Sequence, residues 1–381
     1  MRKFHIKHIY RKIFLFFLIT VIFIFQLQPL MLADTEKPYI NARAFVLMDR
    51  NSGRILYSKN QDLKLPMAST TKIMTAIIAL EKGSLGDMVL VSKKATRIGG
   101  SKFYLKEGQK ISLKSLLYGL LLCSGNDAAI AIAEHIGGSV ENFVNMMNSK
   151  AAEIGAYNTH FANPHGLDDP EHYTTAKDLA IITRYALNNP VFCEIVSTKE
   201  IEIIERDFRR RINNTNKLLR IVDYVNGVKT GYTGKAGKCL VASATLKDVS
   251  IISVILDSQN HFKESLRLIN FGLKSYRPEE LVEENKVYTT VRVKSGIRDN
   301  LDLIASEKII ALVNEDEKIE IKNFVPDEIK APIRKGQDVG ELCVFINGEL
   351  SYKVKLQAAY DLRRKSLFDI LRELVFEWAR F

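Results

Sequence analysis

The sequence predicts an α+β fold, in which an antiparallel sheet with a helical layer is followed by a small all-β domain. Helical patterns gather between residues 69 and 188, and strand patterns lie on both sides of them. The strands do not alternate with helices as they do in a parallel βαβ chain. From residue 286 to residue 356, only short alternating strand patterns separated by turns occur.

The N-terminus has the pattern of a secretory signal peptide. Basic residues at Arg2, Lys3, Lys7, Arg11 and Lys12 precede the apolar run 13–25, and cleavage is expected after Ala33. The run is short for a membrane-spanning helix, which needs about 20 residues. We therefore expect residues 1–33 to be a signal peptide, with an uncleaved membrane anchor as the alternative. In both cases the protein is exported and works at the extracytoplasmic face of the membrane or in the cell wall.

The elements of the first domain follow in order along the chain. A hairpin is expected over 40–58, because two alternating apolar runs flank the turn-forming stretch DRNSG. Helices are expected over 69–82, over 111–136 with a break at CSGND, over 174–188, and over 261–276. The apolar runs KCLVASA and VSIISVILD, joined by TLKD, predict two further strands.

The patterns predict four parts of the chain: the signal peptide, a first domain over 34–278, a β-sandwich-like domain over 279–358, and an amphipathic helix over 359–381. The apolar face of the last helix comprises Leu367, Phe368, Ile370, Leu371, Leu374, Val375, Trp378 and Phe381. Its other face comprises Arg363, Arg364, Lys365, Asp369, Arg372, Glu373, Glu377 and Arg380. So many charges exclude a spanning helix, so we expect this helix to lie on the membrane surface. The alternative is a helix docked on the β domain.

The charge and the cysteines limit the partners. The net charge is +11, and it is +6 without the five basic residues of the signal. This modest excess suits an anionic wall or membrane surface, and no nucleic-acid motif is present, so nucleic acid is not an expected partner. The four cysteines are scattered and show neither metal-ligand spacing nor a clear disulfide pattern.

Three short motifs carry the chemistry. They are Ser69-x-x-Lys72 at a helix start, Ser124-x-Asn126 at a helix break, and Lys229-Thr230-Gly231 beside a strong strand. Each alone has a structural interpretation: a helix cap, a polar turn, and a hairpin with a solvated lysine. Together and in this order, they form the set found in penicillin-binding proteins and serine β-lactamases.

With these motifs and the segments ASTTKIMTA, CSGNDAAIAIAE and GVKTGYTGKAGKCLVASA, the sequence resembles D-alanyl-D-alanine carboxypeptidases, the low-molecular-mass penicillin-binding proteins. The resemblance implies a first domain of the penicillin-binding and serine β-lactamase-like transpeptidase fold. It implies peptidoglycan pentapeptide stems as substrates, β-lactams as inhibitors, and no metal or cofactor.

The expected catalytic residues are Ser69, Lys72 and Ser124. Ser69 attacks the carbonyl of the penultimate D-alanine, and Lys72 accepts its proton. Lys72 can do so only as a neutral amine, and burial and a second cation both lower a lysine pKa. The resemblance implies that Lys229 is this second cation, because it implies that the third motif closes on the first. Ser124 relays the proton to the leaving amine.

The expected substrate-binding residues are Asn126, Lys229, Thr230, Gly231 and Tyr232. Asn126 bonds the substrate amide and holds Lys72. Lys229 and Thr230 suit the terminal carboxylate, and Gly231 permits close backbone approach. The backbone N–H groups of Ser69 and Tyr232 form the expected oxyanion hole.

Two alternatives of function stay open at this stage. A β-lactamase of the same fold relies on a loop glutamate, and the E-x-x-L-N pattern that carries it is absent between the second and third motifs. A non-catalytic wall-binding scaffold usually lacks a motif residue, and none is missing here. His165 and His172 are expected to shape a loop near the site, and Arg209, Arg210 and Arg211 are expected to form a solvated hairpin tip.

Overall fold

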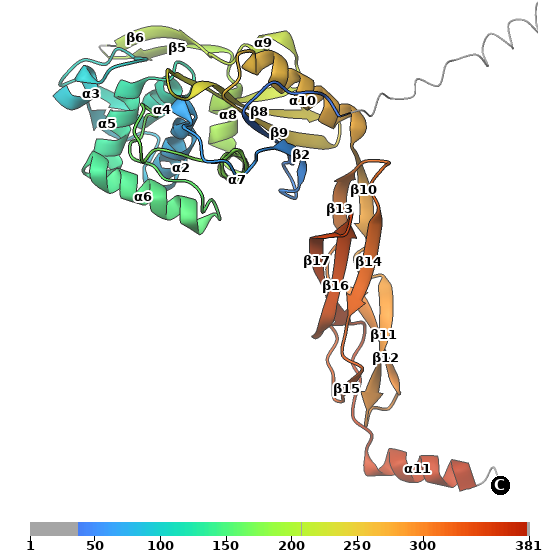
Figure 1. The fold of residues 1–381 in the computed structure, drawn as a ribbon. Helices are drawn as coiled ribbons and strands as arrows, with labels where there is room; N and C mark the ends of the chain where they lie inside the picture. The colour runs from blue at the N-terminus through green and yellow to red at the C-terminus, as the bar shows by residue number, and fades with distance from the viewer. Residues whose placement is uncertain (1–36, 207, 379–381) are drawn as a thin grey trace, which may run out of the picture. The chain divides into compact units, whose positions relative to one another are not determined.

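The computed structural model describes residues 37–206 and 208–378, so the predicted signal peptide lies outside the described residues. The elements of the first domain are β1 (Ala44–Asp49), β2 (Ile55–Lys59), η1 (Ala68–Thr71), α2 (Lys72–Lys82), β3 (Met88–Leu90), α3 (Lys93–Arg97), β4 (Lys110–Ser112), α4 (Leu113–Leu121), α5 (Asn126–Gly137), α6 (Val140–Glu153), α7 (Ala176–Ala186), α8 (Pro190–Ser197), β5 (Glu200–Glu205), β6 (Phe208–Asn213), α9 (Leu218–Ile221), β7 (Val225–Thr233), β8 (Gly237–Leu246), β9 (Val249–Leu256) and α10 (His261–Ser275) (Figure 1). The elements that follow are β10 (Arg277–Val282), β11 (Val287–Lys294), β12 (Asn300–Ala305), β13 (Ile309–Val313), β14 (Ile319–Phe324), β15 (Glu328–Lys330), β16 (Asp338–Ile346), β17 (Glu349–Ala358) and α11 (Leu367–Trp378).

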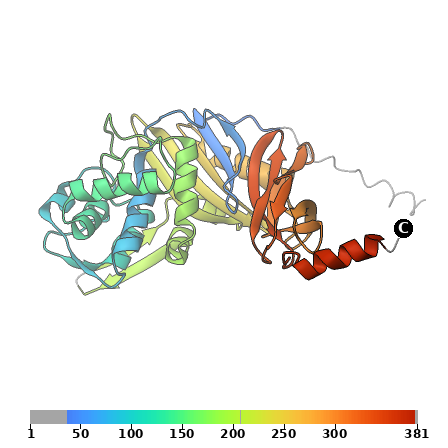
Figure 2. The same ribbon diagram turned by 90° about the horizontal axis from the view of Figure 1, so that it is seen from below.

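A five-stranded antiparallel sheet organises the first domain. Its strand order is β2-β1-β9-β8-β7, which places β7 at one edge. The helical layer covers one face of this sheet and α10 covers the other (Figures 1 and 2). Because both faces are covered, β8 and β9 are almost continuously apolar, as the sequence predicts.

Strand β1 shows how the two faces divide. Val46 and Met48 belong to the core on the helical side, which includes Ile73 and Ile77 of α2. The intervening Phe45 and Leu47 belong to the core under α10. This period of two is the ordinary alternation of a strand, and it fixes the register of the sheet between two apolar layers.

The second domain is all-β. Its six-stranded sheet has the order β14-β16-β17-β12-β11-β15, and β10 pairs with β13 in a separate ladder. Buried residues from both ladders form one apolar core. The α+β class with a following all-β domain is therefore confirmed.

The C-terminal helix begins later than the sequence predicts. It begins at Leu367, whereas a helix from residue 359 was expected. The reason is that Leu362 is buried in the β domain and pairs with Ile333. Among the helices that the structure describes, none is long and apolar enough to cross a membrane.

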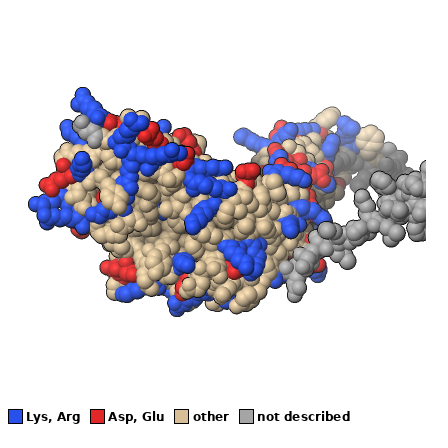
Figure 3. Space-filling view, turned by 90° about the horizontal axis from the view of Figure 1, so that it is seen from above, with Lys and Arg blue, Asp and Glu red and all other residues tan. Residues whose placement is uncertain are grey.

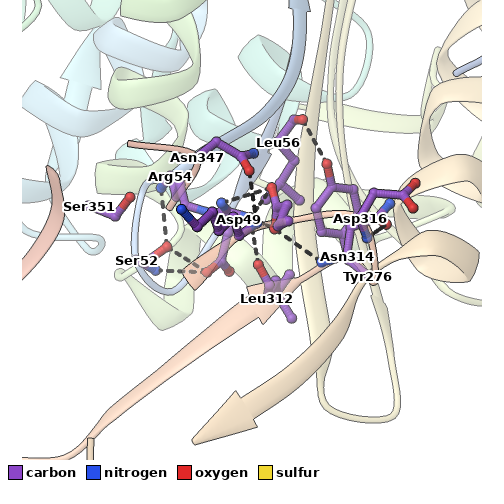
Figure 4. A network of polar contacts seen from close by, with 12 residues as sticks. Asp49, Ser52, Arg54, Leu56, Tyr276, Leu312, Asn314, Asp316, Asn347 and Ser351 are labelled. Atoms are coloured by element: carbon purple, nitrogen blue, oxygen red, sulfur yellow. Dashed lines mark hydrogen bonds and ion pairs between the residues drawn. The ribbon is translucent and has the colours of Figure 1, made fainter. Parts of the chain in front are cut away.

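A largely buried ion pair connects the β1–β2 hairpin with the turn between β13 and β14 in the second domain (Figure 4). Nη2 of Arg54 lies 2.9 Å from Oε2 of Glu317, and both side chains are nearly buried. Nη2 also donates to the carbonyl oxygen of Leu312 at 2.7 Å. Removing one partner of such a pair leaves the other charge uncompensated, so we expect replacement of either residue alone to destabilise the fold.

Candidate active site

The first motif begins in a 3-10 turn, η1, that runs directly into α2. Ser69 lies within η1, and Lys72 is the first residue of α2. No side chain caps either helix, so the hydroxyl of Ser69 is not used as a helix cap. Nζ of Lys72 lies 2.9 Å from Oγ of Ser69. The structure thus brings the predicted nucleophile and base into direct hydrogen-bond contact.

Lys72 is fully buried, and its amine meets two further oxygens. Nζ lies 2.8 Å from Oδ1 of Asn126 and 2.5 Å from the backbone oxygen of His165. The amide of Asn126 has a defined orientation because its Nδ2 donates to the carbonyl of Gly99 at 2.7 Å. Both oxygens can only accept, so they take the two hydrogens of a neutral amine. Its lone pair is then left for the hydroxyl proton of Ser69.

The electrostatics favour this neutral amine. Burial lowers the pKa of Lys72 well below its ordinary value, and the charge of Lys229 lowers it further. Burial also lowers the pKa of Lys229, to about 8, which leaves this second amine largely protonated at neutral pH. Both causes predicted from the sequence for Lys72 are therefore present: desolvation first, and the neighbouring cation second.

The second motif forms the turn between α4 and α5. Ser124 has a φ of 64°, which is unusual for a residue with a side chain. Its Oγ is buried and has no hydrogen-bond partner among the described residues. An unpaired buried hydroxyl costs free energy, so its presence here suggests a group with a task in the reaction.

The third motif lies on β7, the edge strand. A Cβ atom on Gly231 would lie 3.0 Å from the backbone nitrogen of Ser69 and 3.1 Å from the oxygen of Met67, so a side chain there would crowd η1. Nζ of Lys229 donates to the carbonyl of Thr230 at 2.9 Å. Oγ1 of Thr230 lies 2.7 Å from Oγ1 of Thr215. The side chain of Tyr232 is 68% exposed, so it is not drawn into this cluster.

A loop over 163–168 completes the site, and sequence reasoning missed its role. It supplies the backbone oxygen of His165 to Lys72 and that of Pro164 to Thr75, at 2.6 Å. Gly166 has a φ of +88°, and a Cβ atom there would lie 1.9 Å from the oxygen of Ala68. The turn-forming letters NPHG were the available signal, but they do not say which carbonyl faces a lysine.

The two histidines of this region support the loop. The backbone N–H of Ala162 donates to Nδ1 of His172, so the ring proton is on Nε2, which faces Oγ1 of Thr71 at 2.7 Å. Burial is the main cause that lowers the pKa of His172 to about 4 and that of His165 to about 3. Both rings are therefore neutral at neutral pH, and they contribute to the site by supporting the loop.

The cation of Lys229 gives a testable pH dependence. The sequence predicts Lys72 as the base, and a base works only when deprotonated, so the acylation rate is expected to rise with pH as Lys72 loses its proton. Lys229→Met removes the charge that lowers the pKa of Lys72. We expect the rising limb of the pH profile, over which the acylation rate increases, to move to higher pH. The pH profile of penicillin acylation measures this shift. Lys235→Met, at an exposed position beyond β7, is the control and should leave the limb in place. A limb that stays in place in Lys229→Met would contradict the electrostatic coupling.

The chain is similar to known proteins along nearly all of the described length. Residues 32–260 match the family model described as D-alanyl-D-alanine carboxypeptidase, and residues 276–364 match the one described as penicillin-binding protein 5, C-terminal domain. The sequence is 38% identical to the D-alanyl-D-alanine carboxypeptidase DacF of Bacillus subtilis over 81% of this chain and 82% of the relative. It is 35% identical to DacC of Escherichia coli over 86% of each chain. The fold is similar to penicillin binding protein 5 from Haemophilus influenzae, with a TM-score of 0.75 and 32% identity over 86% of this chain and 99% of that one.

Proposed function

The chain belongs to the D-alanyl-D-alanine carboxypeptidase family, and from this membership we propose which residues perform the reaction. It is a serine-type carboxypeptidase that acts on the stem peptides of peptidoglycan, and it binds β-lactams. The proposal is that Ser69 is the acylated residue and Lys72 its base. The observation that carries it is the contact of 2.9 Å between Oγ of Ser69 and the buried amine of Lys72.

In the acylation step, the Ser69 hydroxyl gives its proton to Nζ of Lys72, and Oγ forms a bond to the carbonyl carbon of the penultimate D-alanine. The negative charge then resides on the former carbonyl oxygen. The backbone N–H groups of Ser69 and Tyr232 are proposed to bind this oxyanion; a single donor of this kind contributes roughly 3–4 kcal/mol in other enzymes. The closeness of Gly231 to the nitrogen of Ser69 supports this pairing.

Next, the C–N bond breaks and the amine of the terminal D-alanine must gain a proton. Ser124 has a buried hydroxyl without a partner, and it is proposed to pass the proton from Lys72 to this amine. Lys229 and Thr230 are proposed to hold the carboxylate of the departing D-alanine, with Thr215 as a neighbour of Thr230. Water, deprotonated by Lys72, then attacks the ester carbon and releases the shortened peptide and free Ser69.

Assay of a purified pentapeptide stem tests this function against the two alternatives. We expect stoichiometric labelling by penicillin together with release of one D-alanine per pentapeptide. Labelling without release would instead indicate a non-catalytic wall-binding protein. Rapid hydrolysis of penicillin without D-alanine release would indicate a β-lactamase.

We further propose that the enzyme is exported and that α11 holds it on the membrane surface. Large apolar side chains of this helix are exposed: Leu367, Phe368, Leu371, Leu374, Val375, Phe376 and Trp378. Exposed apolar area of this extent, with Trp378 near its end, is typical of a helix that lies in the membrane interface. Residues 359–381 contain five basic and four acidic residues, so their net charge is small and apolar contact is the main source of affinity.

Removing α11 should release an active enzyme from membranes. The cut is best placed after Lys365, because Leu362 is buried in the β domain and a cut at residue 357 would remove it. We accordingly propose that the β domain extends from about residue 277 to residue 365. The truncated enzyme is expected to release D-alanine at the rate of the full chain but to stay in the supernatant when vesicles are sedimented.

The matched control is the full chain with Leu371→Gln and Leu374→Gln, two changes in exposed side chains of α11. This variant should also lose most of its vesicle binding while keeping its melting temperature. Truncated enzyme that still sediments with vesicles would place the membrane contact elsewhere in the chain.

A further inference from the structure

Arg210 faces away from the two arginines that flank it. Arg209 and Arg211 form exposed ion pairs with Glu202 and Glu200 on one face of the β5–β6 hairpin. Arg210 is directly opposite Ile203, which is buried, so its side chain lies on the inner face. The expectation of a solvated tip is wrong for this residue.

The guanidinium of Arg210 packs against two aromatic rings, and one of its nitrogens, Nη1, lacks an acceptor among the described residues. Its central carbon lies 4.3 Å from the ring centroid of Tyr104 and 5.8 Å from that of Phe103. Its Nη1 is buried and has no hydrogen-bond partner in the described structure. Stacking fixes the plane of a guanidinium, and Arg210 as a whole is partly exposed, so part of the group stays accessible to a planar anion. A buried charged donor without a partner calls for an explanation, and a bound anionic group that supplies the acceptor is one.

The neighbouring segment is built to present Tyr104. This residue has a φ of 59°, which is costly for an aromatic residue, and its side chain is 67% exposed. The buried carboxylate of Asp127 accepts the backbone N–H groups on either side, from Phe103 at 2.7 Å and from Leu105 at 3.1 Å. Asp127 is thereby occupied and does not serve as the partner of Arg210.

This segment borders the second motif. A Cβ atom on Gly125 would lie 2.8 Å from Cβ of Phe103, and the backbone N–H of Asn126 donates to the oxygen of Ser101 at 2.8 Å. Burial raises the pKa of Cys123, the residue before Ser124, and the charge of Arg210 lowers it. Arg210 and Tyr104 therefore lie beside the turn that carries Ser124 and Asn126.

We propose that Arg210 and Tyr104 form a subsite for a second carboxylate of the stem peptide, separate from that of the terminal D-alanine. This inference rests on the proposed function, because it assumes that the stem peptide binds beside Ser124. A guanidinium recognises a carboxylate through two parallel hydrogen bonds, and a stacked tyrosine keeps it in place.

The surrounding charge suits such a substrate. Residues 37–275 contain 32 Lys and Arg against 22 Asp and Glu. Figure 3 shows the side of the molecule that bears β5, β6 and α10, where basic side chains spread widely over the first domain.

Three pentapeptide stems test the proposal: one with free carboxylates at the second residue (glutamate) and the third (a diamino diacid), and two with one of these carboxylates amidated. We expect wild-type kcat/KM to fall about tenfold on amidation of one of them, a difference of about 1.4 kcal/mol. In Arg210→Gln, the ratio of kcat/KM for the peptide with free carboxylates to kcat/KM for that amidated peptide should approach one. The position whose amidation matters identifies which carboxylate is bound.

Arg209→Gln is the matched control, because Arg209 is the neighbour that points to the opposite face; it should keep the wild-type ratio. If Arg210→Gln melts at a lower temperature, Arg210→Lys replaces it, and the ratio should then fall at least about threefold because an ammonium lacks the planar fork. Two results would contradict the proposed subsite. One is a kcat/KM ratio near one in the wild-type enzyme, and the other is an equal loss of kcat/KM on all three peptides in the variants. Since D-alanine release from the amidated peptides is still measured, the carboxypeptidase function is judged separately.

Discussion

Replacing Lys72 with arginine is expected to slow acylation of Ser69 by about a hundredfold or more, although the positive charge is kept. A positioned general base contributes about 10²–10⁴-fold to a rate. Arginine stays protonated in proteins, so it cannot accept the proton of Ser69. It would also bring a larger, permanently charged group into a fully buried position that accommodates one amine. The second-order rate constant for penicillin acylation is the direct measurement.

Lys82→Arg is the control, since Lys82 lies at the exposed end of the same helix. It should acylate at the wild-type rate. If Lys72→Arg acylates within about tenfold of wild type, which corresponds to about 1.4 kcal/mol or less, Lys72 is not the base.

Ser69→Ala is expected to abolish the penicillin adduct and to lower D-alanine release by at least about 10⁴-fold. Loss of the nucleophile in serine hydrolases costs as much as loss of the whole catalytic group, because the group acts as a unit. The amine of Lys72 would remain buried beside Asn126, but the oxygen that it activates would be gone. Intact-mass analysis after penicillin treatment should show one adduct on the wild-type chain and none on the variant.

The control for this change is Ser84→Ala, at an exposed position just after α2. It should carry the full adduct. Ser124 also has a buried hydroxyl near the site, so peptide mapping of the wild-type adduct is needed to show which of the two serines carries it. An adduct that persists in Ser69→Ala would move the nucleophile to another residue.

Much of the candidate site could be predicted from the sequence, because its side chains come from motifs whose residues are close together in the chain. Ser69 and Lys72 are three residues apart, so a single helical turn brings them together wherever the helix lies. Lys229 and Gly231 belong to a strand whose apolar neighbour β8 was recognisable. The apolar patterns likewise predicted the sheet, the helical layer and the β domain.

Other parts of the site depend on backbone atoms and on turns whose geometry the sequence does not specify. The oxygen of His165 binds Lys72, yet every residue type has that oxygen. The inward orientation of Arg210 follows from strand register, and three consecutive arginines give no apolar alternation from which to infer it. The late start of α11 results from pairing of Leu362 with Ile333, a contact distant in the chain.

The backbone at Ser124 also has a consequence for how this enzyme can evolve. A left-handed φ of 64° with a side chain costs of order 1–3 kcal/mol, and the unpaired hydroxyl adds to that cost. Glycine at this position would relieve the strain and stabilise the fold, but it would remove the proposed proton relay. Selection for greater thermal stability would thus favour the glycine variant, whereas selection for turnover through the proposed relay would retain the serine. The stability of this fold and its catalytic power are therefore opposed at a single residue.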